Sequence, residues 1–331
     1  MAEKYYQPNL FFDAWSKGTH VKDPSGHPRT LYHGTKSKTI FTAFDIDNPS
    51  MDEESWYGRG IYLTSNPEDA SHNYALPNSP DFEHKVSRRA EEIVNFIQDE
   101  LNYDEDSALS EGAKYGLHTK EQIESDDAYS IAEEHLRDEY GEVPRTIPLY
   151  VRLENPAIVS PGAPRNFYIE LNEDTNEETG PGLSVYNTLV ALAEDYGFDG
   201  QMMWEGLGIY DEFNYWDIEN PLRDSASLYN DVDIKAGEFI KEFYQRMGHD
   251  GIILDAAGAF KHMDYVTPGT QHYILWSPAQ VKSSIGNTGF YDPENASILA
   301  EDINEKLVTA ALLDHYGLYR HADTFDSICF Q

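Results

Sequence analysis

Five short apolar runs, each bounded by turn residues, constrain the fold of this chain more than any other feature. They cover residues 30–32, 60–64, 147–153, 251–254 and 272–276. Their length and boundaries are typical of β-strands, and the long segments between them are helical or irregular. Strands distributed in this way predict an α+β fold with an antiparallel sheet, not a doubly wound one.

Two segments have apolar residues at helical spacing and end at a glycine. One is expected to begin at a capping Ser184 and to end at Gly197, and the other to run from Asp233 to Gly248. Each ends in a similar step, Gly-Phe-Asp-Gly or Gly-His-Asp-Gly. Two copies of a helix stop make a poor case for an internal repeat. A last helix is expected over residues 303–317.

Acidic residues gather in one part of the chain. Residues 98–144 carry 15 Asp or Glu against three basic residues. Ser87 is the expected cap of a helix whose apolar face covers residues 90–101, and Thr119 opens a capping box for a second helix that Gly141 would close. Residues 81–142 are therefore expected to form an acidic helical insertion with a hydrated surface.

Composition excludes several classes of protein. The chain of 331 residues has 24 basic and 59 acidic residues, a net charge of −35, which disfavours an extended nucleic-acid surface or a membrane surface. Its single cysteine, Cys329, leaves no internal disulfide and no cysteine-based metal site. No apolar run reaches the roughly 18 residues of a membrane span, and the first residues lack a signal-peptide core, so a soluble, unexported protein is expected.

Motifs for other common chemistries are also missing. The chain has no Gly-x-Gly-x-x-Gly after a strand, no phosphate-binding Gly-x-x-x-x-Gly-Lys-Ser/Thr, and no His-Glu-x-x-His. Its 12 histidines are scattered without metal-ligand spacing, so no metal site is expected.

Three clusters are candidates for a site. The first is Leu-Tyr-His-Gly-Thr at 31–35, where a strand ends in a histidine and in a glycine that lets a ligand approach the backbone. The second joins Gly-Arg-Gly-Ile-Tyr at 58–62 to Ser-His-Asn-Tyr at 71–74, and its Tyr62 and Tyr74 could flank a flat heteroaromatic group. The third begins with Gln271 and His272 and is stopped by Pro278. Taken alone, each is typical of strand ends and half-buried core tyrosines.

Together, in this order and at these separations, the clusters resemble the ADP-ribosyltransferase superfamily, in the branch with a His-Tyr pattern shared by diphtheria toxin and the poly-ADP-ribose polymerases. Four further segments are similar to the ADP-ribosyltransferase-like domains of phage and mobile-element polyvalent and MuF-type proteins. They are residues 21–28, Leu-Glu-Asn-Pro at 153–156, Asp-Gly-Ile-Ile at 250–253 and Gln-Val-Lys-Ser-Ser-Ile-Gly-Asn at 280–287. The resemblance covers about 20–78, 147–160 and 245–293.

The resemblance implies a split antiparallel β-sandwich around an NAD cleft, in one domain over residues 1–331. The acidic insertion at 81–142, a second mostly helical insertion at 161–245 and a C-terminal helical extension at 294–331 lie outside it.

The resemblance also implies roles for individual residues, with NAD as the substrate. His33 would bind the adenosine ribose, Gly34 would pair its backbone with the nicotinamide carboxamide, Ser71 would touch the carboxamide, and Tyr62 and Tyr74 would enclose the nicotinamide ring. Holding the leaving group flat between two rings suits cleavage through an oxocarbenium-like state. The remaining expected contacts to NAD come from Thr35, Arg59 and Gly60. A basic groove for the pyrophosphate or for a nucleic-acid end is expected near Arg29, Lys36, Lys38 and Arg59.

The chain departs from the family pattern at the catalytic glutamate, where it has His272 with Gln271 beside it. A neutral imidazole can orient the ribose 2′-hydroxyl or take a proton from an acceptor, but it supplies no fixed negative charge. Three options stay open: transfer with a His or Gln in that role, a nucleophile on an insertion, or a fold without catalysis. The sequence does not place the carboxylates of Glu205, Asp255 and Asp264, and a second Gly-x-Gly-Ile-Tyr at 206–210 is taken as coincidence.

The resemblance thus predicts a mono-ADP-ribosyltransferase that cleaves the nicotinamide–ribose bond of NAD and transfers ADP-ribose to a macromolecular acceptor, a protein or a nucleic acid. A phage or mobile-element effector that acts in the cytoplasm of a bacterial host is the expected setting. The alternatives are a catalytically silent binding or virion-associated module and an NAD glycohydrolase.

Overall fold

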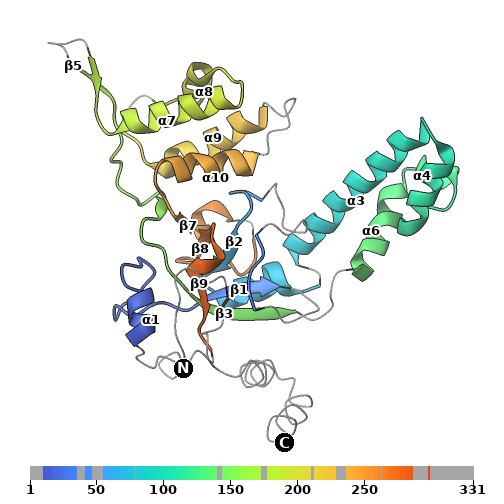
Figure 1. Ribbon diagram of the computed structural model, residues 1–331, viewed down its shortest axis with the longest axis horizontal. Coiled ribbons are helices and arrows are strands. Elements are labelled where there is room, and N and C mark those ends of the chain that lie inside the picture. The colour runs from blue at the N-terminus through green and yellow to red at the C-terminus, as the bar shows by residue number, and fades with distance from the viewer. Residues whose placement is uncertain are drawn as a thin grey trace, which may run out of the picture.

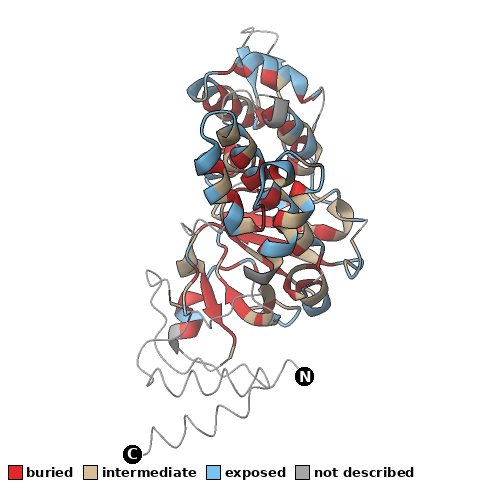
Figure 2. Cartoon of the chain, turned by 90° about the vertical axis from the view of Figure 1, so that its right-hand side faces the viewer, coloured by how far each residue is buried: buried red, intermediate tan, exposed pale blue. Residues whose placement is uncertain are grey.

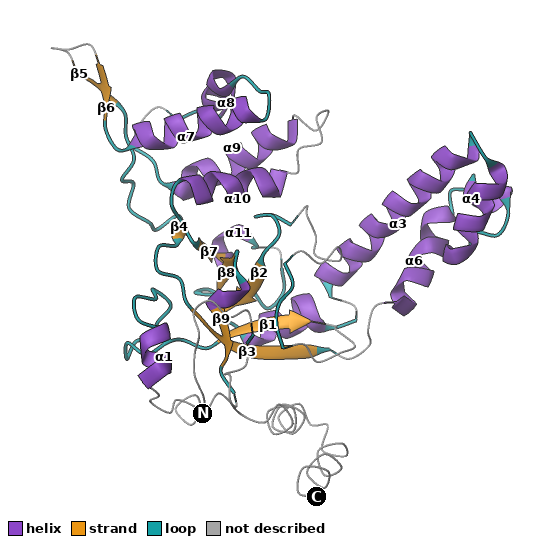
Figure 3. Cartoon of the chain, viewed as in Figure 1, coloured by secondary structure: helices purple, strands orange, loops and turns teal. Residues whose placement is uncertain are grey.

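The computed structural model describes residues 10–35, 42–46, 55–77, 79–139, 144–172, 177–209, 212–228, 236–261, 263–285 and 297–298. The fold is α+β. Its centre is a seven-stranded sheet with the strand order β4-β7-β8-β2-β1-β3-β9, which Figure 3 shows in orange between the helices. The strands are β1 (Leu31–Thr35), β2 (Ile61–Thr64), β3 (Arg145–Val151), β4 (Ala157–Val159), β7 (Gly251–Asp255), β8 (Gln271–Leu275) and β9 (Val281–Ser283).

All five expected strands are confirmed, with ends that differ by a few residues, but the expectation of a purely antiparallel sheet is wrong. β4 pairs with β7 in parallel, while the other neighbours are antiparallel. A parallel pair needs a long crossover, and here the segment between β4 and β7, whose described residues include four helices, supplies it. The same segment carries a separate exposed hairpin, β5 (Glu170–Asn172) and β6 (Glu177–Thr179).

The seven strands are joined weakly at one place. β1 forms five register pairs with β3, and β2 forms four with β8, but β1 and β2 share only the pair Tyr32 and Thr64. No other register pair joins β1 to β2 among the described residues. The sheet is therefore split between β1 and β2.

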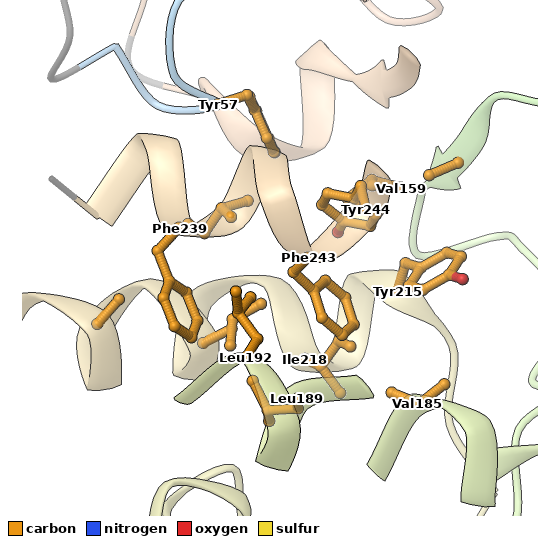
Figure 4. Close-up of a cluster of buried hydrophobic side chains, with 14 of the residues drawn as sticks. Tyr57, Val159, Val185, Leu189, Leu192, Tyr215, Ile218, Phe239, Phe243 and Tyr244 are labelled. Carbon is orange, nitrogen blue, oxygen red and sulfur yellow. The ribbon is translucent and has the colours of Figure 1, made fainter. Parts of the chain in front are cut away.

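Four helices of the described part of the chain pack on one face of β4, β7 and β8, at the top of Figure 1. They are α7 (Gly182–Asp195), α8 (Gly200–Gly206), α9 (Tyr215–Leu228) and α10 (Ala236–Arg246). Figure 4 shows their apolar side chains packed together, among them Leu189, Ile218 and Phe243. The other face of the sheet has its own buried cluster, which includes Leu31 and Leu149.

One of the two expected helix starts is wrong, and the other cannot be compared with the described residues. Ser184 does not cap α7, because the helix begins at Gly182 after Pro181, and the Ser184 hydroxyl donates to the Pro181 carbonyl at 2.9 Å from inside the first turn. The expected cap Asp233 lies outside the described residues. The two glycine steps lead to different elements, α8 after Gly197 and β7 after Gly248, which agrees with the absence of a repeat.

The acidic segment forms a helical lobe, defined as α3–α6, that lies to the right of the sheet in Figure 1. Its elements are α3 (Pro80–Leu101), α4 (Glu105–Gly112), the short 3-10 helix η3 (Ala113–Tyr115), α5 (Lys120–Ile123) and α6 (Ala128–Glu139). These helices bury a cluster of their own, with Val94, Ile97 and Leu117 at its centre. Figure 2 shows the exposed residues in pale blue on the outer surfaces of the helices.

The expected boundaries inside the helical lobe are right in one place and wrong in two. The Thr119 capping box is confirmed, since the Thr119 hydroxyl and the Gln122 side chain cap each other's backbone. The helix it opens ends at Ile123, and α6 is a separate helix. Ser87 lies within α3, which starts at Pro80 because the Ser79 side chain accepts the Phe82 N–H at 3.3 Å.

Three of the sequence motifs that resemble the family lie outside the candidate site, and hydrogen bonds join them into one junction. They are the motifs at 153–156, 250–253 and 280–287. The Asp250 carboxylate accepts the backbone N–H groups of Glu154 at 2.6 Å and Asn155 at 3.0 Å. The Gln280 side-chain amide donates to the carbonyls of Asp250 at 2.8 Å and Arg152 at 3.3 Å. Charge-assisted bonds to backbone N–H groups are among the stronger hydrogen bonds in proteins. The junction fixes the start of β7 against the segment after β3.

The remaining short elements are α1 (Leu10–Trp15), α2 (Pro67–Asp69), the π-helix η2 (Ala70–Ala75), α11 (Ala256–Ala259) and the 3-10 helix η5 (Pro278–Gln280). No helix among the described residues is both long and apolar enough to cross a membrane. Several positions named from the sequence lie outside the described residues. They are the expected helix at 303–317 and the residues Lys36, Lys38, Gly141, Tyr210 and Cys329.

Candidate functional site

The split between β1 and β2 is bridged by the side chain of His33. Its Nδ1 lies 2.9 Å from the Tyr62 carbonyl oxygen, so the imidazole takes the place of a backbone ladder bond. The ring packs edge-on against Phe44, with ring centroids 5.0 Å apart, and Phe44 belongs to the cluster that includes Leu31. His33 therefore holds the strands apart at a fixed separation while its ring lies on the face opposite the four helices.

Tyr62 lies on the other face, at the end of a loop fixed by hydrogen bonds. Its hydroxyl donates to the Gly58 carbonyl at 2.8 Å and accepts the Tyr57 N–H at 3.1 Å. Burial raises the pKa of the Tyr62 hydroxyl, so the ring stays neutral at physiological pH. The loop and the ring thus hold each other in place.

Helices α9 and α10 hold the same loop from above. The Arg223 guanidinium donates to the Trp56 carbonyl at 2.6 Å and lies over the Trp56 ring, 4.5 Å from its centroid. The backbone of Arg59 is bound at both ends, with its N–H donating to Glu238 and its carbonyl accepting from Lys241. Helices α9 and α10 therefore position the loop that carries Arg59 and leads to Tyr62.

Gly34 is required by the close approach of η2. A Cβ built at Gly34 would lie 2.1 Å from the Ala70 carbonyl oxygen and 2.8 Å from the Tyr74 Cβ. Only the missing side chain lets η2, which carries Ser71 and Tyr74, lie directly over β1. Gly60 plays a similar part at the next strand, where a Cβ would lie 2.8 Å from the Leu275 carbonyl oxygen.

The rings of Tyr62 and Tyr74 are near each other without touching. Burial, followed by the charge of Asp69, raises the pKa of the Tyr74 hydroxyl, and Tyr62 is close enough to contribute to that rise. No ring contact joins these two side chains. The Tyr74 hydroxyl makes no hydrogen bond to any described residue.

His272 is paired with a buried carboxylate that the sequence does not single out. Its Nε2 lies 2.8 Å from Oδ2 of Asp69, which is fully buried at the start of η2. The Asn73 amide donates to Asp69 Oδ1 at 2.8 Å and to the Asp264 carbonyl at 2.6 Å. Burial alone would raise the pKa of the Asp69 carboxyl, but the hydrogen bond and charge interaction with His272, and bonds from Asn73 and Thr64, hold that pKa below its ordinary value.

Gln271 does not share the position of His272. Successive side chains of a strand point to opposite faces, and the Gln271 Oε1 accepts from the Tyr273 hydroxyl at 2.8 Å and from Arg29 at 3.4 Å. Both partners lie away from Tyr74. The structure thus brings Gly34, Tyr62, Tyr74 and His272 together and leaves the side chains of His33, Gln271 and Arg29 on the opposite face.

Further aromatic side chains, which the sequence alone does not single out, lie in a row from His272 to the exposed Trp56. Phe260 lies 5.2 Å from the His272 ring and 5.0 Å from the Trp56 ring, measured between centroids, and Trp56 is exposed. On the inner side the Tyr74 ring is 5.9 Å from His272, edge to face. These rings reach the site from segments far apart in the chain, so no local sequence pattern could have grouped them.

Four other residues considered from the sequence take part in strand pairing, in hydrogen bonds at helix ends or in a hydrogen bond between side chains. Thr35 ends β1 opposite Arg145, and the Ser71 carbonyl accepts the Leu76 N–H at the end of η2. Asp255 caps α11 by accepting the Gly258 N–H at 3.1 Å, and Glu205 accepts from Gln201 at 2.9 Å. Among the described residues no group of three or more His, Cys, Asp or Glu side chains is arranged to hold a metal ion.

Comparison with protein-family models, curated proteins and solved structures finds no match to this chain.

Proposed function

We propose that this protein is a mono-ADP-ribosyltransferase that cleaves the nicotinamide–ribose bond of NAD. The observation that carries the proposal is the meeting of four separate segments at the split in the sheet. Gly34 from β1, Tyr62 from β2, Tyr74 from η2 and His272 from β8 lie on one face, in the order and spacing that resemble the superfamily. On this proposal the split sheet is the family's NAD-binding fold.

The nicotinamide ring would lie between Tyr62 and Tyr74. Both hydroxyls have a raised pKa because they are buried, so both rings are neutral and present polarisable faces to a flat cationic ring. The register of β1 with β2 consists of the pair Tyr32 and Thr64, so the Gly34 backbone has no β2 register partner and could pair with the carboxamide. Fixing the leaving group in one orientation lowers the entropic part of the barrier.

The rest of the NAD molecule would cross the split toward His33. Its imidazole bridges the two strands at the point where they separate, next to the Tyr62 carbonyl. Arg59, whose backbone α10 fixes, is the described basic residue nearest in sequence to Tyr62 and would face the pyrophosphate. Arg29 is not part of this set, because it contacts Gln271 on the other face.

Transfer to a macromolecule is favoured over a silent fold because His272 is held in a definite orientation next to Tyr74 by a buried acid. A fold kept only for contacts has no need of a buried, fully hydrogen-bonded carboxylate at this place, since burying a charge costs free energy. The resemblance to phage and mobile-element domains suggests a bacterial host as the source of the acceptor.

The test is incubation of the full chain with NAD labelled on the adenylate phosphate, with and without bacterial lysate. We expect stoichiometric release of nicotinamide and label on a macromolecule in the lysate. Free ADP-ribose without a labelled macromolecule would indicate an NAD glycohydrolase instead. Intact NAD under both conditions would contradict the proposal and favour a silent binding module.

A further inference from the structure

We infer that the acceptor presents a hydroxyl group, and that His272 takes its proton while Asp69 acts as the positioning residue. The inference rests on the proposed function and deepens it by naming the chemical class of the acceptor. It comes from the pair that Asp69 and His272 form, which neither the motif spacing nor the family pattern indicates.

Asp69 fixes the tautomer of the imidazole. A carboxylate has only acceptor oxygens, so the 2.8 Å contact requires a proton on Nε2 of His272. Asp69 cannot turn away, because Asn73 donates to its other oxygen at 2.8 Å and is itself bound to the Asp264 carbonyl at 2.6 Å. In the neutral imidazole the unprotonated nitrogen is therefore Nδ1.

Nδ1 is the nitrogen available for chemistry. It has no hydrogen-bond partner among the described residues, and the His272 side chain keeps an exposed fraction of 8%. The ring is held between Phe260 and Tyr74, at centroid distances of 5.2 and 5.9 Å. Its strand position is opposite Thr64, two residues from Tyr62 on β2. The imidazole thus lies next to Tyr74 and on the face of the sheet that carries Tyr62.

A positioned neutral imidazole suits an acceptor that must lose a proton during transfer. The nicotinamide–ribose bond breaks and its electron pair leaves with neutral nicotinamide. The acceptor oxygen forms a bond to the ribose carbon, and its proton passes to His272 Nδ1. The resulting imidazolium is stabilised by Asp69, and the proton is then released to solvent. Atoms and charge balance without any further reactant.

Other acceptors fit this pair less well. A carboxylate is already ionised at neutral pH and has no proton to give, and a guanidinium holds its protons too tightly for an imidazole base. A hydroxyl of a side chain, of a sugar or of water has a proton that must be removed as the bond forms. Water and a macromolecular hydroxyl share this chemistry, and different products distinguish them.

The experiment compares two small nucleophiles with NAD: methanol, which must lose a proton, and azide, which is already an anion. Products are separated by mass as ADP-ribose, its methyl glycoside and its azide. For His272→Gln we expect water and methanol products to form about 10²- to 10⁴-fold more slowly, with the azide reaction changed less than about threefold. For Asp69→Asn we expect about 10²-fold slower methanol transfer with the same sparing of azide, because the tautomer is no longer fixed.

His118→Gln is the matched control, since it makes the same change at an exposed histidine of the helical lobe. Equal losses with methanol and azide would overturn the inference by showing a purely structural role, and so would unchanged methanol transfer in His272→Gln. If the unmodified chain consumes NAD with none of the three nucleophiles, the proposed function itself fails and the inference falls with it.

Discussion

Replacing Tyr74 with alanine is expected to weaken the binding of nicotinamide about 10- to 100-fold, because stacking on an aromatic side chain is worth about 1–3 kcal/mol. The affinity of Tyr74→Phe for nicotinamide should stay within about threefold of that of the unmodified chain. The phenylalanine should suffice because the Tyr74 hydroxyl makes no hydrogen bond to any described residue. Tyr62 differs, since its hydroxyl is bound to Gly58 and Tyr57. The ring of Tyr74, not its hydroxyl, is the proposed binding group.

The measurement is a titration of the full chain with nicotinamide, followed by calorimetry or by saturation-transfer NMR. Tyr103→Ala is the matched control, because Tyr103 is 89% exposed in the helical lobe and lies outside the proposed site. Unfolding temperatures of all variants separate lost binding from lost structure. Equal affinity in Tyr74→Ala and the unmodified chain, or an equally large loss in Tyr74→Phe, would contradict the stacking role.

Gly34→Ala should both destabilise the protein and abolish the site. The added methyl group would lie 2.1 Å from the Ala70 carbonyl oxygen, a backbone atom that cannot move without moving η2. Overpacking of this kind costs about 1–3 kcal/mol in the free energy of unfolding. Because η2 carries Ser71, Tyr74 and the end of the Asp69 network, its displacement should reduce NAD consumption by about 10²-fold or more.

Gly162→Ala is the control for this substitution, because only the Ser160 hydroxyl comes within 4 Å of a Cβ there, at 3.8 Å. Denaturant unfolding and NAD consumption are measured on both variants. Retention of full stability and activity by Gly34→Ala would show that η2 does not need its close contact with β1.

The sequence predicts the strands of the sheet well because their apolar runs are short and clearly bounded. It misses β4 and β9, which have three residues each and no pattern distinguishable from a loop. The parallel pairing of β4 with β7 is also invisible locally, since it depends on how the intervening helices cross the sheet. Ser87 and Ser184 are wrong as caps because serines within a helix look the same in sequence as serines before it.

The candidate site is predictable in part. The segments with His33, Tyr62, Tyr74 and His272 do lie around one split in the sheet. Strand alternation alone separates Gln271 from His272, so that distinction was available from the sequence. The contact between Asp69 and His272 joins residues 203 positions apart, and only the fold brings them together. Asp69 and Asn73 are four residues apart on one helical turn, which is the single local hint of their hydrogen bond.

The most direct test of the account is a crystal structure of this chain with an NAD analogue whose nicotinamide–ribose bond cannot be cleaved. We expect the nicotinamide ring between Tyr62 and Tyr74, its carboxamide on the Gly34 backbone, and the ribose next to His272 Nδ1. An analogue bound at another place, or no binding at millimolar concentration, would contradict the account.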